Sequence, residues 1–214
     1  MITLYSYYRS STSFRVRIAL NLKGLDYRIV PVNLATAEHR REEFLQINPF
    51  GGLPVLEIDG QRFPQSLAIL EMLEERYPTP PLWPQDPDSR AQARALAYSI
   101  ATDIHGMNNL RTLNYLRSDW AATPEKISAW IAHWVAVTFE PLEAQLQALC
   151  VDQPLPFGDV GLFEAILVPQ VYSARRFKVD LDPYPNIQRI EAVCMGIDAI
   201  RRAAPETQID APRE

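Results

Sequence analysis

Three hydroxyl-bearing side chains follow the first apolar segment of the chain, where a strand pattern gives way to a helix pattern. Ser10, Ser11 and Thr12 come directly after Arg9, and apolar residues then recur at helical spacing. The first N–H groups of a helix lack partners and the helix dipole is positive there, so such a position favours an anion. A thiolate is one such anion, and its pKa falls near a helix N-terminus. The simpler interpretation is a serine that only caps the helix.

A second hydroxyl, Ser66, follows Gln65 at the start of another expected helix. Its surroundings suit a carboxylate, although a plain serine cap is again the simpler interpretation. Before it, a proline loop ends in Leu53-Pro54 and leads into a strand. Leu53 can offer its backbone N–H and carbonyl to an extended peptide, and the sequence leaves the isomer of the bond to Pro54 open. Together the two helix starts predict a surface for a small peptide with a thiolate and a carboxylate.

The composition excludes several other classes of function. The 214 residues carry a net charge of −5 and are 47% hydrophobic, which is typical of a globular protein and argues against nucleic-acid binding. No apolar run approaches the roughly 20 residues that span a bilayer, and we identify no secretion signal. Two cysteines and three histidines without motif spacing argue against a metal site. We expect Cys150 and Cys194 to be buried free thiols, in a cytoplasmic protein.

Residues 1–77 alternate between strand and helix patterns. Asp59-Gly60 is a strong two-residue hairpin signal between two short strand patterns. The sequence predicts strands at 2–7, 27–32, 55–58 and 61–63, and helices at 13–23, 38–47 and 65–76. This order predicts an α/β fold, a small mixed sheet with helices packed on it.

Prolines crowd the stretch 78–88, which predicts a stiff linker. Beyond it the patterns are almost entirely helical, with helices expected at 89–117, 123–149, 161–174 and 187–203. Glu164 stands three residues after Gly161 and predicts a partial capping box. The polar tail from Pro205 is expected to be mobile. We therefore expect an α/β domain at 1–77, a linker at 78–88 and an all-helical domain at 89–214.

Several motifs resemble the zeta class of the cytosolic glutathione transferases. Residues 10–19 resemble the class signature, residues 65–69 its glutathione-binding helix start, and residues 103–111 and 168–180 two stretches of its helical domain. The resemblance implies a thioredoxin-like N-terminal domain, a C-terminal helical bundle, glutathione as cofactor and a homodimer. The class includes maleylacetoacetate isomerases and the similar maleylpyruvate isomerases.

The resemblance also implies roles for the matching residues. Ser10, Ser11 and Thr12 are the implied catalytic residues beside the glutathione sulfur. Leu53 would pair main chain to main chain with the cysteinyl unit. The implied glutathione contacts are Ser10, Ser11, His39, Leu53, Gln65, Ser66, His105 and Asn109. The implied contacts to a small dicarboxylate substrate are Arg9, His105, Asn108, Arg111 and Arg176.

The chain departs from the class pattern at two places. Thr12 replaces the usual cysteine, which removes a second thiol but keeps a hydroxyl donor, as in a variant found among maleylpyruvate isomerases. Gly51-Gly52 replace a basic residue and a glutamine ahead of Leu53. This second change removes side-chain hydrogen bonds near glutathione.

The implied reaction is cis–trans isomerisation of maleylacetoacetate or maleylpyruvate. A thiolate adds to the double bond, the resulting single bond rotates, and elimination restores the double bond. Arginines suit the carboxylates of such a substrate. Two alternatives stay open: a zeta-class transferase that conjugates or dehalogenates small haloacids, and a non-catalytic binding protein of the same fold. A thiol oxidoreductase is disfavoured because residues 1–77 contain no cysteine.

Overall fold

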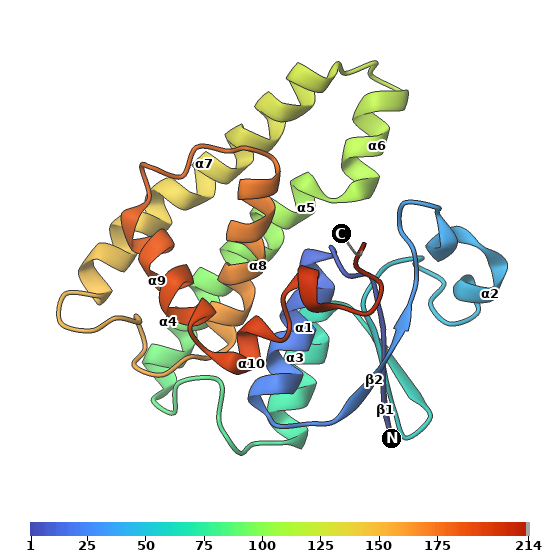
Figure 1. Ribbon diagram of the computed structural model, residues 1–214. Helices are drawn as coiled ribbons and strands as arrows, with labels where there is room; N and C mark the ends of the chain where they lie inside the picture. Colours follow the sequence, from blue (N-terminus) through green and yellow to red (C-terminus); the bar gives the residue numbers. More distant parts are fainter. Residues whose placement is uncertain (213–214) are drawn as a thin grey trace. The chain divides into compact units, whose positions relative to one another are not determined.

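The computed structural model describes residues 1–212, and the chain divides into two compact units (Figure 1). The first unit comprises residues 1–82 together with the C-terminal segment from residue 195, and the second comprises residues 83–194. The sequence analysis instead assigns that C-terminal segment to the helical part. The domain boundaries expected from the sequence, at 1–77, 78–88 and 89–214, stay a prediction.

The first unit is built on a four-stranded mixed sheet, within the described part of the chain, with the order β2-β1-β3-β4. Its strands are β1 (Ile2–Ser6), β2 (Tyr27–Pro31), β3 (Val55–Ile58) and β4 (Gln61–Pro64). β1 pairs parallel with β2, whereas β1 with β3 and β3 with β4 are antiparallel. The predicted hairpin is confirmed, since Asp59 and Gly60 both have positive φ, 52° and 78°, between β3 and β4.

Helices cover both faces of this sheet (Figure 1). α1 (Ser11–Leu22) and α3 (Ser66–Arg76) pack against each other on one face, and the short α2 (Glu42–Leu45) lies on the other. The alternation of β1 explains this division, because successive side chains point to opposite faces. Leu4 is fully buried, while Tyr5 meets the Phe44 ring of α2 edge to face.

The single helix expected at 38–47 is wrong. A 3-10 helix (Glu38–Arg40) is followed by α2, and Arg41 between them is extended, with φ −74° and ψ 153°. An extended residue cannot continue the helical ladder of hydrogen bonds. The break leaves His39 buried in a separate turn.

The C-terminal segment packs onto the first unit, so the mobile tail expected from Pro205 is wrong for the described residues. It contains α10 (Asp198–Arg201) and a 3-10 helix (Pro205–Thr207). The backbone N–H of Tyr8 donates to the Asp210 carboxylate at 2.9 Å. The buried Arg17 donates from Nε to the Ala203 carbonyl at 2.9 Å, and from Nη2 to the Tyr8 carbonyl at 2.9 Å. These contacts hold the loop that precedes Ser10.

The second unit is helical. Its helices are α4 (Pro87–Tyr98), a π-helical turn (Ser99–Ile104), α5 (His105–Asn108), α6 (Leu110–Ser118), α7 (Pro124–Leu149), α8 (Leu162–Arg176) and α9 (Pro185–Met195), the last ending at the boundary residue. The long helix expected at 89–117 is wrong, because Asn109 is extended and caps α6 through its side chain, which accepts from Thr112 N–H at 3.1 Å. The helix expected at 187–203 is likewise split, because Ile197 is extended between α9 and α10.

Two helices form the centre of the second unit. α7 presents apolar side chains at helical spacing, and α8 is buried along most of its length. The partial capping box is confirmed: the fully buried Glu164 accepts the Gly161 N–H at 2.8 Å. Cys194 is buried as expected, whereas Cys150 is half-buried, and both are free thiols. Burial raises the pKa of the Cys194 thiol.

Candidate active site

The start of α1 is a capped and uncompensated helix terminus. Ser10 has the extended backbone of an N-cap, and its Oγ accepts the Ser13 N–H at 3.2 Å. The first turn carries no acidic residue, so its own side chains do not neutralise the positive end of the dipole. The plain cap is therefore confirmed for Ser10, and it does not remove the preference of the site for an anion.

Hydroxyl hydrogen bonds tie this helix start to the proline loop. Thr12 Oγ1 donates to the Leu53 carbonyl at 2.9 Å and lies 3.0 Å from Ser10 Oγ. A hydroxyl has one proton, so Ser10 is the donor in the second hydrogen bond. Ser11 is half-buried, and its hydroxyl has no partner within residues 1–212. Thr12, predicted to lie beside the sulfur, thus fixes the loop, while Ser11 presents the available hydroxyl.

The proline loop has a backbone that only glycine fits easily. The Leu53–Pro54 peptide is cis, and Asn48 Nδ2 donates to the Gly52 carbonyl at 2.9 Å. Gly51 has φ +58°, and a Cβ there would stand 3.0 Å from the His39 carbonyl oxygen. The basic side chain usual at this position does not suit this backbone. The glycine at position 51 is therefore explained by the positive φ of this loop.

The start of α3 is the second uncompensated terminus. Gln65 has φ 72° and makes no side-chain cap, and the first turn carries no acidic residue. Ser66 follows as the first helical residue and is buried. The buried Arg15 of α1 donates from Nη1 to Ser66 Oγ at 3.5 Å. This end of α3 therefore combines unpaired N–H groups, a hydroxyl and a guanidinium, which are donors for a carboxylate.

His39 is buried, and its Nδ1 has no hydrogen-bond partner. Burial lowers the pKa of the imidazole, and the charge of Arg40 lowers that pKa further. The ring is therefore neutral at physiological pH.

Four predicted residues of the second unit lie along one short segment through α5 and the start of α6. His105 begins α5 and Arg111 is exposed in the first turn of α6. Asn109 caps α6 and also donates from Nδ2 to the Gly106 carbonyl at 2.7 Å. Both polar atoms of its side chain therefore make hydrogen bonds within the turn between α5 and α6. The Oδ1 of Asn108 is buried without a partner. Their roles toward ligands stay predictions.

Two of the three arginines implied as substrate contacts, Arg9 and Arg176, are exposed and lie against a neighbouring aromatic ring. The Arg9 guanidinium carbon is 5.6 Å from the centre of the Tyr8 ring. The Arg176 carbon is 4.2 Å from the centre of the Phe177 ring. These contacts restrict both side chains. The roles of both arginines toward a substrate stay predictions.

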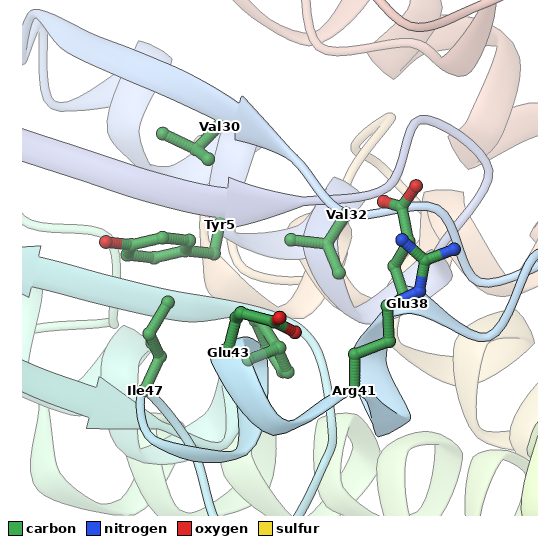
Figure 2. Close-up of a pocket in the computed structure, with 8 residues that line it drawn as sticks. Tyr5, Val30, Val32, Glu38, Arg41, Glu43 and Ile47 are labelled. Carbon is green, nitrogen blue, oxygen red and sulfur yellow. The ribbon is translucent and has the colours of Figure 1, made fainter.

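A separate hollow of about 290 Å³ lies on the α2 face of the sheet (Figure 2). It is lined by Tyr5, Val30, Val32, Glu38, Arg41, Glu43, Phe44 and Ile47. None of the predicted site residues lines it.

Two further properties concern the described residues only. Residues 1–212 contain no group of three or more His, Cys, Asp or Glu side chains that could hold a metal ion. No helix within the same residues has the length and hydrophobicity needed to cross a bilayer.

Comparisons with known proteins agree with this fold. The family description "Glutathione S-transferase, N-terminal domain" matches residues 4–81. A maleylpyruvate isomerase from Ralstonia sp. is 47% identical, over 97% of this chain and 99% of that protein. A maleylacetoacetate isomerase from Pseudomonas aeruginosa is 46% identical, over 98% of each.

Solved structures extend the comparison. The holo structure of a maleylpyruvate isomerase, a bacterial zeta-class glutathione transferase, superimposes with a TM-score of 0.96 at 46% identity, covering 98% of this chain and 100% of that one. A maleylacetoacetate isomerase from Anaeromyxobacter dehalogenans, with dicarboxyethyl glutathione and citrate in its active site, has a TM-score of 0.87 at 37% identity, covering 100% and 98%. The chain has the glutathione transferase fold. It belongs to the zeta-class family of maleylpyruvate and maleylacetoacetate isomerases.

Sequence reasoning missed the part played by Arg15. The residue lies inside the hydroxyl-rich motif, but it was treated as part of the helix body. A signal was available: Arg15 stands four positions before Ala19, on the apolar side of α1, where an arginine is costly without a partner.

Proposed function

We propose that this protein is a glutathione-dependent cis–trans isomerase of maleylpyruvate or maleylacetoacetate. One structural observation carries the proposal: two helix starts without acidic neighbours, α1 and α3, lie in a single unit. One is rich in hydroxyls and suits a thiolate, and the other combines a serine with a buried guanidinium and suits a carboxylate. Membership of the zeta class supports the same assignment.

The donor set of the first unit fits glutathione. Ser66, Gln65 and the free N–H groups of α3 would hold the γ-glutamyl carboxylate. Leu53 would present its backbone to the cysteinyl unit. The neutral His39, whose buried Nδ1 has no partner, would donate to or accept from the glycyl end. The hydrogen bonds of Thr12 hold the start of α1 against the Leu53 loop.

When bound, glutathione supplies a thiolate that can add reversibly to a conjugated double bond. The contribution of this chain is to keep that sulfur ionised. The hydroxyl of Ser11 and the unpaired N–H groups of α1 would donate to it, and the dipole of α1 would favour the thiolate. Ser10 holds those N–H groups in place as the cap. Its proton can also turn from Thr12 to the sulfur.

Arginine side chains would bind the carboxylates of the substrate. Arg9, Arg111 and Arg176 are exposed guanidinium groups suited to bidentate pairing. His105 and Asn108 would add hydrogen bonds. Support comes from the dicarboxylate-bearing ligand in the relative from Anaeromyxobacter dehalogenans.

The test is a glutathione-dependent assay with purified protein. We expect isomerisation of maleylpyruvate or maleylacetoacetate only when glutathione is added, without net consumption of glutathione. Calorimetric titration should show glutathione binding that weakens clearly in Ser66→Ala. Arg176→Ala should raise the Michaelis constant for the diacid about ten- to a hundredfold and leave glutathione affinity nearly unchanged. Absence of isomerisation, together with efficient dehalogenation of small haloacids, would overturn the proposal in favour of a transferase.

We further propose a homodimer, the commonest assembly of cytosolic oligomers and the one expected from the class. Sedimentation at micromolar concentration should show twice the mass of the 24.4 kDa chain. A single species of the chain mass would contradict this expectation.

A further inference from the structure

Arg15 is a buried cation without a counter-charge. Its side chain is 1% exposed, and its one hydrogen bond within residues 1–212 is donated from Nη1 to Ser66 Oγ. Nε and Nη2 have no partner within residues 1–212. Burial lowers the pKa of the guanidinium to about 10, so it stays charged at neutral pH. A buried charge without a partner is strongly unfavourable, and it therefore needs an explanation.

Arg17, two residues further along the same helix, shows what a purely structural arginine does there. It is as deeply buried as Arg15, but its nitrogens donate to the carbonyls of Ala203 and Tyr8 and to Ser6 Oγ. Arg15 has no such set of acceptors. An anionic ligand that binds beside Arg15 would supply the missing partner and explain the position of this arginine.

The guanidinium of Arg15 faces the start of α3. That helix end is positive, lacks a side-chain cap and carries no acidic residue in its first turn. Two positive features thus meet around Ser66 with no anion between them. Since Ser66 Oγ accepts from Arg15 Nη1, the serine proton is left to point toward a third group. An acceptor with negative charge would satisfy the hydroxyl, the helix end and the guanidinium together.

We propose that Arg15 is a positioning residue that makes this helix start selective for the α-carboxylate of the γ-glutamyl unit of glutathione. It acts through Ser66, whose hydroxyl it orients, and through its own charge. The inference rests on the proposed function and deepens it, because it assigns the selectivity for this carboxylate to a residue buried behind the binding surface.

The experiment compares two ligands and does not depend on turnover. Calorimetry measures binding of glutathione and of 4-aminobutyryl-cysteinyl-glycine, which lacks only the α-carboxylate. Arg15→Met should weaken glutathione binding about tenfold and leave binding of the decarboxylated peptide unchanged. Arg28→Met, which removes an exposed arginine from β2, is the control and should change neither affinity.

Three substitutions of Arg15 distinguish a loss of the charge from a loss of folding. Arg15→Met should fold, because methionine fills a similar volume and removes an uncompensated charge. Arg15→Gln is a second neutral variant with the same expected result, should the first prove insoluble. Arg15→Lys keeps the charge and should restore most of the discrimination between the two ligands.

The outcomes separate the two proposals. Glutathione affinity unchanged in both neutral variants would overturn the role of Arg15, and so would an equal loss of affinity for both ligands, which is the mark of a purely structural residue. If the unaltered protein binds no glutathione at millimolar concentration, the proposed function itself fails. Weakened glutathione binding with an unchanged affinity for the decarboxylated peptide supports both.

Discussion

Glu164 should make the second unit less stable as pH rises. The side chain is 1% exposed on α8, and burial raises the pKa of its carboxyl to about 7 in the folded protein, from 4.5. Only one of its oxygens accepts a hydrogen bond, from Gly161 N–H, and Oε1 has no partner. The folded state therefore favours the neutral acid.

The direction of the pH dependence of stability follows from the number of protons that each state binds. Between pH 4.5 and 7 the folded state holds more protons than the unfolded state, so stability is full below this window and falls as pH rises through it. A shift of this size corresponds to a loss of about 3 kcal/mol by pH 8, as an upper limit. Cys194, whose pKa burial raises, stays neutral throughout and adds nothing to the slope.

Glu164→Gln isolates this effect, because the amide keeps an acceptor for Gly161 N–H and does not titrate. All four tryptophans (Trp83, Trp120, Trp130 and Trp134) belong to the second unit, so urea denaturation followed by tryptophan fluorescence reports on that unit. The variant and the unaltered protein should be similar near pH 5, and the variant about 3 kcal/mol more stable near pH 8.

An exposed glutamate of the same unit provides the matched control. Glu140→Gln replaces an exposed carboxylate on α7 and should leave the pH profile of the unaltered protein in place. Parallel profiles for Glu164→Gln and the unaltered protein between pH 5 and 8 would refute the reasoning. They would mean that the buried carboxyl is ionised in the folded state at little cost.

Three more predictions concern the first unit. Thr12→Val should cost about 1–2 kcal/mol by far-ultraviolet circular dichroism and weaken glutathione binding, because the Leu53 carbonyl loses its donor; Thr12→Ser should restore both. Arg17→Met should cost about 1–3 kcal/mol, because it leaves the Ala203 carbonyl without its donor, and should expose the segment that follows Ala203 to limited proteolysis; equal resistance in variant and parent would contradict this. Gly51→Ala should lower the melting temperature more than Gly60→Ala, since both have positive φ but only Gly51 has atoms within 4 Å of an added Cβ.

Local chemistry made much of the fold predictable from the sequence. The hairpin at Asp59-Gly60 depends on two adjacent residues that tolerate positive φ. The cap at Ser10 and the acceptor at Glu164 each act across three residues of one helix start. Interactions of this range are contained in the order of residues. The family resemblance adds the cofactor class, because its motifs are contiguous stretches of chain.

Helix breaks were less predictable, because apolar periodicity continues across them. Residues 89–117 keep a helical pattern, yet Asn109 turns extended and starts a new helix. The asparagine pair at 108–109 was a usable cap signal that the periodicity outweighed. Arg41 gave no comparable signal, and only the packing of α2 on the sheet decides its conformation.

The sequence by itself determined the class, the two anion-suited helix starts and the residues that form them. Only the tertiary structure decided which of those residues are already engaged. Thr12 meets Leu53, Arg15 meets Ser66, and Arg17 meets Ala203 across 186 positions of the chain. The physical reason is that a side chain's partner depends on how distant elements pack, and neither spacing nor periodicity records that packing. A buried arginine with acceptors and one without them look alike in the sequence, and only the fold separates them.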